Sequence, residues 1–267
     1  MIGVVVDKQS NSLKKVIFML KEERYDKILE ILEEETYVSA HKLSKMLFVS
    51  LPTIRRDLAE LDLRKQIIRS HGGAKKIQDK HIVAPLDFRK TVNSAQKRRL
   101  CKGGASLVSD NDIVFIDAST SALYLPEFLC EKKDITVITN GIPLATMLVK
   151  KGIKTLCAGG EIFENSLANC GSFTEEFIRK FNIDVVIFSC HGVTKDGMLC
   201  DPSLYENQIR KTAISQAKKA VLLCDESKLL KTGPFNLVHI SDIDYIVTDS
   251  SLVGDTFNIP KEKNLIV

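Results

Sequence analysis

Apolar residues near the start of the chain repeat every three or four positions, which is the spacing of amphipathic helices. This pattern predicts three helices, over residues 24–35, 40–47 and 51–64. Ser39 and Ser50 stand immediately before the second and third helices, where a hydroxyl caps the first backbone amides. Only a tight turn separates these two helices, so we expect a helix-turn-helix.

The third predicted helix carries apolar and basic residues on different faces. Ile54, Leu58 and Leu61 fall within one narrow arc at 100° per residue, and this arc forms the core face. Arg55 and Arg56 point elsewhere. The second helix of a helix-turn-helix lies in the major groove of DNA, where arginine pairs with guanine or holds phosphates. The sequence leaves open which of these contacts each arginine makes.

Two β-prone segments flank the Gly72-Gly73 pair and predict a hairpin over residues 67–77, a wing beside the third helix. The side chains of the wing that would reach phosphates are Arg69, His71, Lys75 and Lys76. Histidine also binds metals, but no second ligand lies near His71 in the sequence. We therefore expect neither a metal nor another cofactor.

Short apolar strands alternate with helices after residue 95, and this predicts an α/β domain with a largely parallel sheet. The strands are expected at 113–117, 135–139, 154–158, 185–189, 220–224 and 245–247. The helices are expected near 96–108, 121–131, 142–150, 173–181 and 204–218. The predicted organisation is an N-terminal extension (1–22), a winged helix-turn-helix (23–78), a linker (79–95) and an α/β domain (96–267).

Polar residues follow several of these strands, at the ends where parallel sheets bind ligands. Thr120 and Ser121 enter a helix after the first strand, an arrangement that binds anions. Lys228 follows a later strand and offers an ammonium group to a phosphate. The other candidates at strand ends are Asp117, Asn140, Gly160 and Asp225.

The net charge of +4 is concentrated in one segment. Residues 36–80 hold ten basic and four acidic residues, whereas residues 81–267 hold 22 of each. A local basic excess of this kind is typical of a nucleic-acid-binding surface. The seven cysteines include no C-x-x-C pair, and neither short N-terminal apolar run resembles a signal peptide. We expect reduced thiols, no membrane association and a cytoplasmic location.

Residues 49–58 read VSLPTIRRDL and residues 69–74 read RSHGGA. Together they resemble the signature of the DeoR family of transcriptional regulators. The resemblance implies a winged helix-turn-helix that binds double-stranded operator DNA, mostly as a repressor. The residues it places at DNA are Ser50, Thr53, Arg55, Arg56, Arg69, His71, Lys75 and Lys76. Because paired half-sites need paired heads, we expect a homodimer or homotetramer.

Residues of about 85–250 are similar to the sensor domain of this family, which resembles ribose-5-phosphate isomerase in fold. The resemblance implies a phosphorylated sugar or related metabolite as effector, with its phosphate on the Thr120-Ser121 loop and Lys228 nearby. The implied effector residues are Asp117, Thr120, Ser121, Asn140, Gly160, Glu206, Asp225 and Lys228. Ser119 and Phe163 depart from the family pattern beside this site.

Two other functions compete with an effector-controlled regulator. An isomerase would need a general base, for which Glu206, Asp196 and Asp201 are candidates. The acidic loop of the isomerases is replaced by residues 189–192, which read SCHG, so we expect no catalytic residues and no enzymatic activity. In the remaining alternative the α/β domain only oligomerises, and a direct measurement of effector binding would separate it from a sensor.

Overall fold

The computed structural model describes residues 19–35, 37–64, 66–70, 72–76, 86–250, 256–257 and 260–267. The chain divides into two compact units, Met1–Ala84 and Pro85–Val267. Each unit has a hydrophobic core of its own. Most of the expected N-terminal extension, together with His71, lies outside the described residues.

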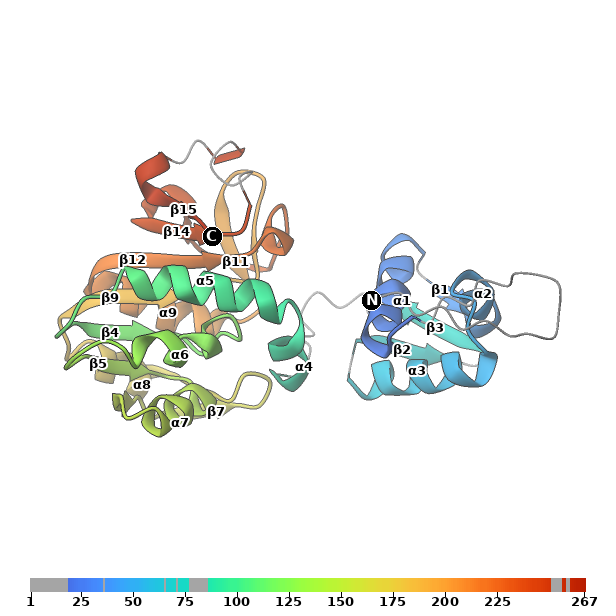
Figure 1. Cartoon of the computed structure of the whole chain (residues 1–267), viewed down its shortest axis with the longest axis horizontal. Helices are drawn as coiled ribbons and strands as arrows, with labels where there is room; N and C mark the ends of the chain where they lie inside the picture. Colours follow the sequence, from blue (N-terminus) through green and yellow to red (C-terminus); the bar gives the residue numbers. More distant parts are fainter. Residues whose placement is uncertain are drawn as a thin grey trace, which may run out of the picture. The chain divides into compact units, whose positions relative to one another are not determined.

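The N-terminal unit is a winged helix-turn-helix, as the sequence predicts (Figure 1). Its elements are α1 (Lys21–Glu34), β1 (Tyr37–Ser39), α2 (Ala40–Met46), α3 (Leu51–Leu63), β2 (Ile67–Ser70) and β3 (Gly73–Lys76). The hydroxyls of Ser39 and Ser50 accept hydrogen bonds from Lys42 N and Thr53 N, which caps α2 and α3 as expected. The sequence did not indicate β1, whose three residues are too few to show a period.

The wing is a small antiparallel sheet in the order β1-β3-β2. Gly73 lies where β3 passes closest to β1, and a Cβ there would overlap Val38 O and the Cα of Ser39. Only glycine fits this approach of two backbones. The Gly72-Gly73 pair thus marks the hairpin turn and also brings the wing onto β1.

A buried ion pair joins α1 to α3. Arg24 donates from Nε to Asp57 Oδ2 at 2.7 Å and from Nη2 to Asp57 Oδ1 at 2.9 Å. Asp57 is 3% exposed. A bidentate pair fixes distance and orientation together, so it sets the face of α3 that packs on Tyr25, Ile28 and Leu32 of α1.

The C-terminal unit is built on a seven-stranded parallel sheet in the order β15-β14-β12-β9-β4-β5-β6. The strands are β4 (Ile113–Ile116), β5 (Thr136–Thr139), β6 (Lys154–Cys157), β9 (Ile183–Phe188), β12 (Ala217–Cys224), β14 (Tyr245–Thr248) and β15 (Asn264–Ile266). The sequence predicted all of these except β15. The α/β fold class is therefore confirmed.

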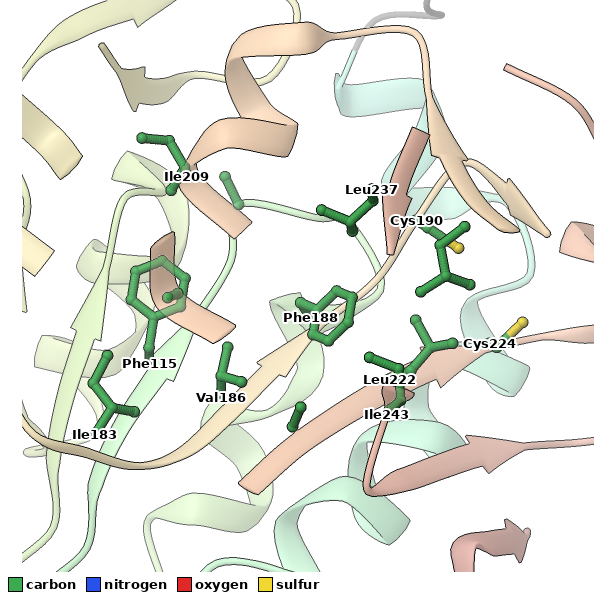
Figure 2. Close-up of a cluster of buried hydrophobic side chains, with 14 of the residues drawn as sticks. Phe115, Ile183, Val186, Phe188, Cys190, Ile209, Leu222, Cys224, Leu237 and Ile243 are labelled. Carbon is green, nitrogen blue, oxygen red and sulfur yellow. The ribbon is translucent and has the colours of Figure 1, made fainter. Parts of the chain in front are cut away.

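Helices cover both faces of this sheet (Figure 1). One face packs against α5 (Ser94–Ser106), α6 (Pro126–Leu129) and α7 (Ile142–Lys150), and the other against α8 (Ser172–Ile178) and α9 (Leu204–Gln216). Figure 2 shows the second core, in which Phe115, Val186 and Phe188 of the strands lie on the same side of the sheet as Ile209 of α9. Alternate residues of β4 enter different cores, which explains why these strands lack polar positions.

The structure differs from the sequence prediction at the expected linker. Its second half forms α4 (Leu86–Thr91) and the start of α5. The six residues of α4 are too few to show a helical period, which is why the sequence does not reveal this helix. The expected helix near 121–131 is instead a short 3₁₀ turn, η1 (Ala122–Tyr124), followed by α6.

In the described part of this unit, two small antiparallel sheets lie outside the seven-stranded sheet. Their strands are β7 (Glu161–Phe163), β8 (Ala168–Cys170), β10 (Gly192–Val193), β11 (Met198–Asp201) and β13 (Phe235–His239). The sequence did not predict them, because two to five residues show no clear alternation.

Removal of the α1–α3 ion pair gives a first prediction. Asp57→Ala removes the buried carboxylate and leaves the half-buried Arg24 without its partner, which costs about 3 kcal/mol. Amide exchange in α1 and α3 should then accelerate about 100-fold. Glu30→Ala, at an exposed position of α1, serves as the control and should change exchange by less than about threefold. Equal effects of the two substitutions would remove the special role of the pair. Hydrogen exchange followed by mass spectrometry is the measurement.

Candidate functional site

The exposed side of α3 presents the residues expected at DNA. Arg55 and Arg56 are exposed, while Ile54, Leu58 and Leu61 are buried against the rest of the unit. The core face predicted for this helix is therefore confirmed. At its start, the hydroxyls of Ser50 and Thr53 lie 2.7 Å apart and hydrogen-bond to each other.

The wing is fastened to α3 through its backbone. Arg69 N donates to Asp62 Oδ1 at 2.9 Å, and the Arg69 side chain is exposed. Arg55, Asp62 and Arg69 line a hollow of about 550 Å³ between α3 and the wing. His71 and the side chains of Lys75 and Lys76 lie outside what the structure describes. The helix and wing together offer arginine side chains on one surface, as groove and phosphate contacts require.

In the α/β domain, Arg210 on α9 is the centre of a buried ionic network. Its guanidinium donates to Asp117 Oδ2 at 2.9 Å, Asp201 Oδ2 at 3.0 Å and Glu206 Oε2 at 3.1 Å. Burial alone would lower the pKa of Arg210, but the nearby carboxylates outweigh burial and raise it. Asp117 and Glu206, two expected effector residues, are thus both engaged by Arg210.

This network fixes the loop that follows β4. The two oxygens of Asp117 also accept from Ser119 N at 3.2 Å and from Ser189 N at 3.4 Å. Ser119, a departure from the family pattern, turns its hydroxyl inward to accept from Ala122 N at 3.3 Å. The loop is therefore fixed by hydrogen bonds between its own residues and by one from Ser189, directly after β9. Thr120 and Ser121 belong to this loop.

Lys228 reaches this loop from η2 (Glu226–Lys228), after β12. Its ammonium donates to Ser189 Oγ at 2.6 Å, Cys190 O at 2.9 Å and Ser121 Oγ at 3.2 Å. Asp225 lies 4.0 Å from the same ammonium group and caps η2 through Ser227 N. The structure thus brings Ser121, Asp225 and Lys228 together from strands that are not neighbours in the sheet.

A second lysine, Lys97 of α5, reaches the loop from another side, and the sequence reasoning missed it. Its ammonium donates to Thr120 Oγ1 at 3.2 Å and to the backbone carbonyl of Arg89. Burial, together with the charge of Lys228, lowers the pKa of Lys97 to about 8. The available signal was its position, since Lys97 shares the buried face of α5 with Leu100 and Cys101.

Two of the expected effector residues lie elsewhere along the sheet edge. Asn140 follows β5, beside Asp117 by strand register, and donates to Asn169 O at 3.0 Å. Gly160 follows β6, which is the outermost strand of the sheet. A Cβ on Gly160 would overlap Thr174 Oγ1 and Cys170 O. The fold therefore requires glycine at position 160 because no larger side chain fits there.

Phe163, the other departure from the family pattern, packs against Tyr205 with ring centroids 5.0 Å apart. In the described part of the chain, no group of His, Cys, Asp and Glu side chains could hold a metal ion. Nor does any helix there have the length and apolar character needed to cross a membrane.

The chain combines a winged helix-turn-helix with an α/β domain that carries a polar site lined by lysines. This combination is typical of DNA-binding regulators with a separate sensing domain. Family models match both halves: residues 24–80 match the DeoR-like helix-turn-helix domain, and residues 92–250 match the DeoR C terminal sensor domain. The chain belongs to the DeoR family of transcriptional regulators, which confirms the resemblance carried by its motifs.

Two transcriptional repressors are similar to this chain over most of their length. The chain is 30% identical over 249 residues to the transcriptional repressor AccR of Agrobacterium fabrum, covering 92% of this chain and 96% of that protein. It is 29% identical to the glycerol-3-phosphate regulon repressor of Escherichia coli, covering 87% and 92%. Among solved structures, it is similar to ribose 5-phosphate isomerase A of Methanocaldococcus jannaschii, with a TM-score of 0.40 and 16% identity over 51% of this chain and 55% of that one.

The lowered pKa of Lys97 predicts a pH dependence of stability. Between about pH 8 and its ordinary value of 10.5, the unfolded chain holds more protons on this residue than the folded chain. The free energy of unfolding should therefore rise with pH across this window. Relative to Lys97→Met, the wild type should gain about 2 kcal/mol between roughly pH 7.5 and 9.5. Urea unfolding of both proteins at the two pH values is the measurement, and parallel profiles would contradict the assignment.

Proposed function

We propose that this protein is a repressor of an operon for sugar or polyol metabolism, and that a phosphorylated sugar or related metabolite controls it from the α/β domain. The observation that carries the proposal is the convergence of Lys97 and Lys228 on the hydroxyls of Thr120 and Ser121. Two ammonium groups beside two hydroxyls suit a phosphate, which offers several acceptor oxygens and up to two negative charges. The names of both relatives, which are repressors, support the direction of control.

Asn140 supports a polyhydroxylated ligand. Its side-chain oxygen is buried and has no hydrogen-bond partner among the described residues. A buried acceptor left unsatisfied costs about 1–3 kcal/mol. A hydroxyl of a sugar or polyol bound beside the Asp117–Ser121 loop would satisfy it. The phosphate would then lie between the two lysines, with the carbon chain toward β5.

Catalysis by this site is not part of the proposal. A general base must be able to exchange its proton with the substrate. Asp201 and Glu206, two candidates for that role, are both ion-paired with Arg210. Asp196 is exposed and lies on the turn between β10 and β11. The engagement of Asp201 and Glu206 by Arg210 therefore supports a binding site rather than an isomerase.

We further propose that the protein acts as a homodimer or homotetramer, in which two winged helices read two half-sites. The effector shifts the population between arrangements of these heads, and its leverage is limited to its differential affinity for them. The recognition contacts proposed are Ser50, Thr53, Arg55, Arg56 and Arg69, with His71, Lys75 and Lys76 of the wing.

The recognition helix is tested on DNA selected by the full-length chain from a random-sequence pool. Arg55→Ala and Arg56→Ala should each weaken binding at least about fivefold, because an arginine contact with a base contributes roughly 1–3 kcal/mol. A base contact also loses sequence preference, whereas a phosphate contact lowers the salt dependence of binding by about one ion. Arg98→Ala, an exposed arginine on α5, is the control. Wild-type affinity in both test variants would refute the recognition-helix assignment.

The effector site is tested by thermal shift against phosphorylated sugars and polyols. A ligand at about 100 times its dissociation constant should stabilise the protein by roughly 2.7 kcal/mol. Lys228→Ala should lose most of this shift but keep its affinity for DNA, because its ammonium faces the site loop. Lys195→Ala, at an exposed position, is the matched control. A full shift in Lys228→Ala would remove this residue from the site.

A further inference from the structure

Hydrogen bonds hold α4 against the rest of the α/β domain. Lys97 Nζ donates to Arg89 O, Tyr124 OH donates to Lys90 O at 3.0 Å, and Arg89 Nη2 donates to Asn165 O at 2.8 Å. The α4 side chains that the structure describes belong to neither hydrophobic cluster of this domain.

These contacts begin at the sensor site. Lys97 bonds to α4 and to Thr120 with the same ammonium group. Tyr124 belongs to η1, which follows the site loop directly. At the corner between α4 and α5, Asn93 Nδ2 donates to Ser227 Oγ at 3.3 Å, one residue before the second lysine of the site. The loop, both lysines and α4 therefore form one connected set of hydrogen bonds.

α4 also brings a third positive charge toward the site. The charges of Lys228 and Arg89 both disfavour the charged form of Lys97. Burial lowers the pKa of Arg89, and the carboxylates of Glu206 and Asp201 only partly oppose this effect. Three cations held close together repel one another in a partly buried setting. A dianion among them would replace this repulsion with attraction.

We propose that an anionic group bound at the Thr120-Ser121 loop clamps α4, so that occupancy of the sensor site fixes the first helix of the α/β domain. This inference rests on the proposed function, in that the site accepts a phosphorylated ligand. Lys97 is the positioning residue, since its three donors can serve Thr120, Arg89 O and the anion together. In sequence, residues 77–85 lead from the winged helix-turn-helix directly into α4. A fixed α4 therefore fixes where this connection leaves the sensor domain.

Hydrogen exchange of the full chain tests the clamp, with inorganic phosphate as the probe and sodium chloride at matched ionic strength as the reference. If phosphate binds only while α4 is in place, phosphate at about four times its dissociation constant should slow exchange of the α4 amides roughly fivefold. The amides of the 117–121 loop should be protected as well. Lys97→Met should keep most of the loop protection, through Lys228, but lose the α4 protection.

Tyr124→Phe is the matched control, because it removes a contact to α4 without altering a charge. Its α4 amides should exchange faster in chloride, yet phosphate should still slow them by the wild-type factor. Protection of the loop without protection of α4 in the wild-type chain would overturn the clamp and leave the proposed function standing. Equal α4 protection in Lys97→Met would overturn the role of Lys97. No protection of the loop at any phosphate concentration would contradict the anion site and the clamp together.

Discussion

The α/β domain depends on one buried guanidinium. Arg210 joins α9 to the end of β4 through Asp117 and to β11 through Asp201. A buried carboxylate without such a partner would be strongly destabilising, so none of these groups can be moved independently. The result is a loop after β4 that is hydrogen-bonded from several sides. Lys97 of α5 and Lys228 of η2 then donate to the hydroxyls of this loop.

The two halves of the molecule use charge in different ways. In the winged helix-turn-helix, Arg24 and Asp57 neutralise each other inside the fold. Arg55 and Arg56 are exposed, on the surface proposed to bind DNA. In the α/β domain, Arg210 is neutralised by carboxylates, whereas Lys97 and Lys228 meet mainly hydroxyls and carbonyls. Asp225 lies 4.0 Å from Lys228, farther than the carboxylates that bond to Arg210, so positive charge is less closely neutralised at the proposed phosphate site.

Patterns that extend over several turns or several buried positions could be read from the sequence. The three N-terminal helices and six parallel strands belong to this group. The partners of Asp117 and Glu206 could not be read, because the link from Asp117 to Arg210 spans 93 positions and only the folded chain brings them together. The burial of Lys97 could not be read either, because lysines on helices are usually exposed to solvent. The six residues of α4 are too few to show a helical period, so the sequence predicts a linker where this helix forms.

The most direct test of this account measures DNA binding and effector binding in one experiment. Fluorescence anisotropy of a selected DNA fragment bound to the full-length chain would be titrated with phosphorylated sugars and with their unphosphorylated counterparts. The account predicts that at least one phosphorylated compound changes the affinity for DNA, while its counterpart at the same concentration does not. An equal response to both forms, or no response to any phosphorylated compound across a broad panel, would contradict it.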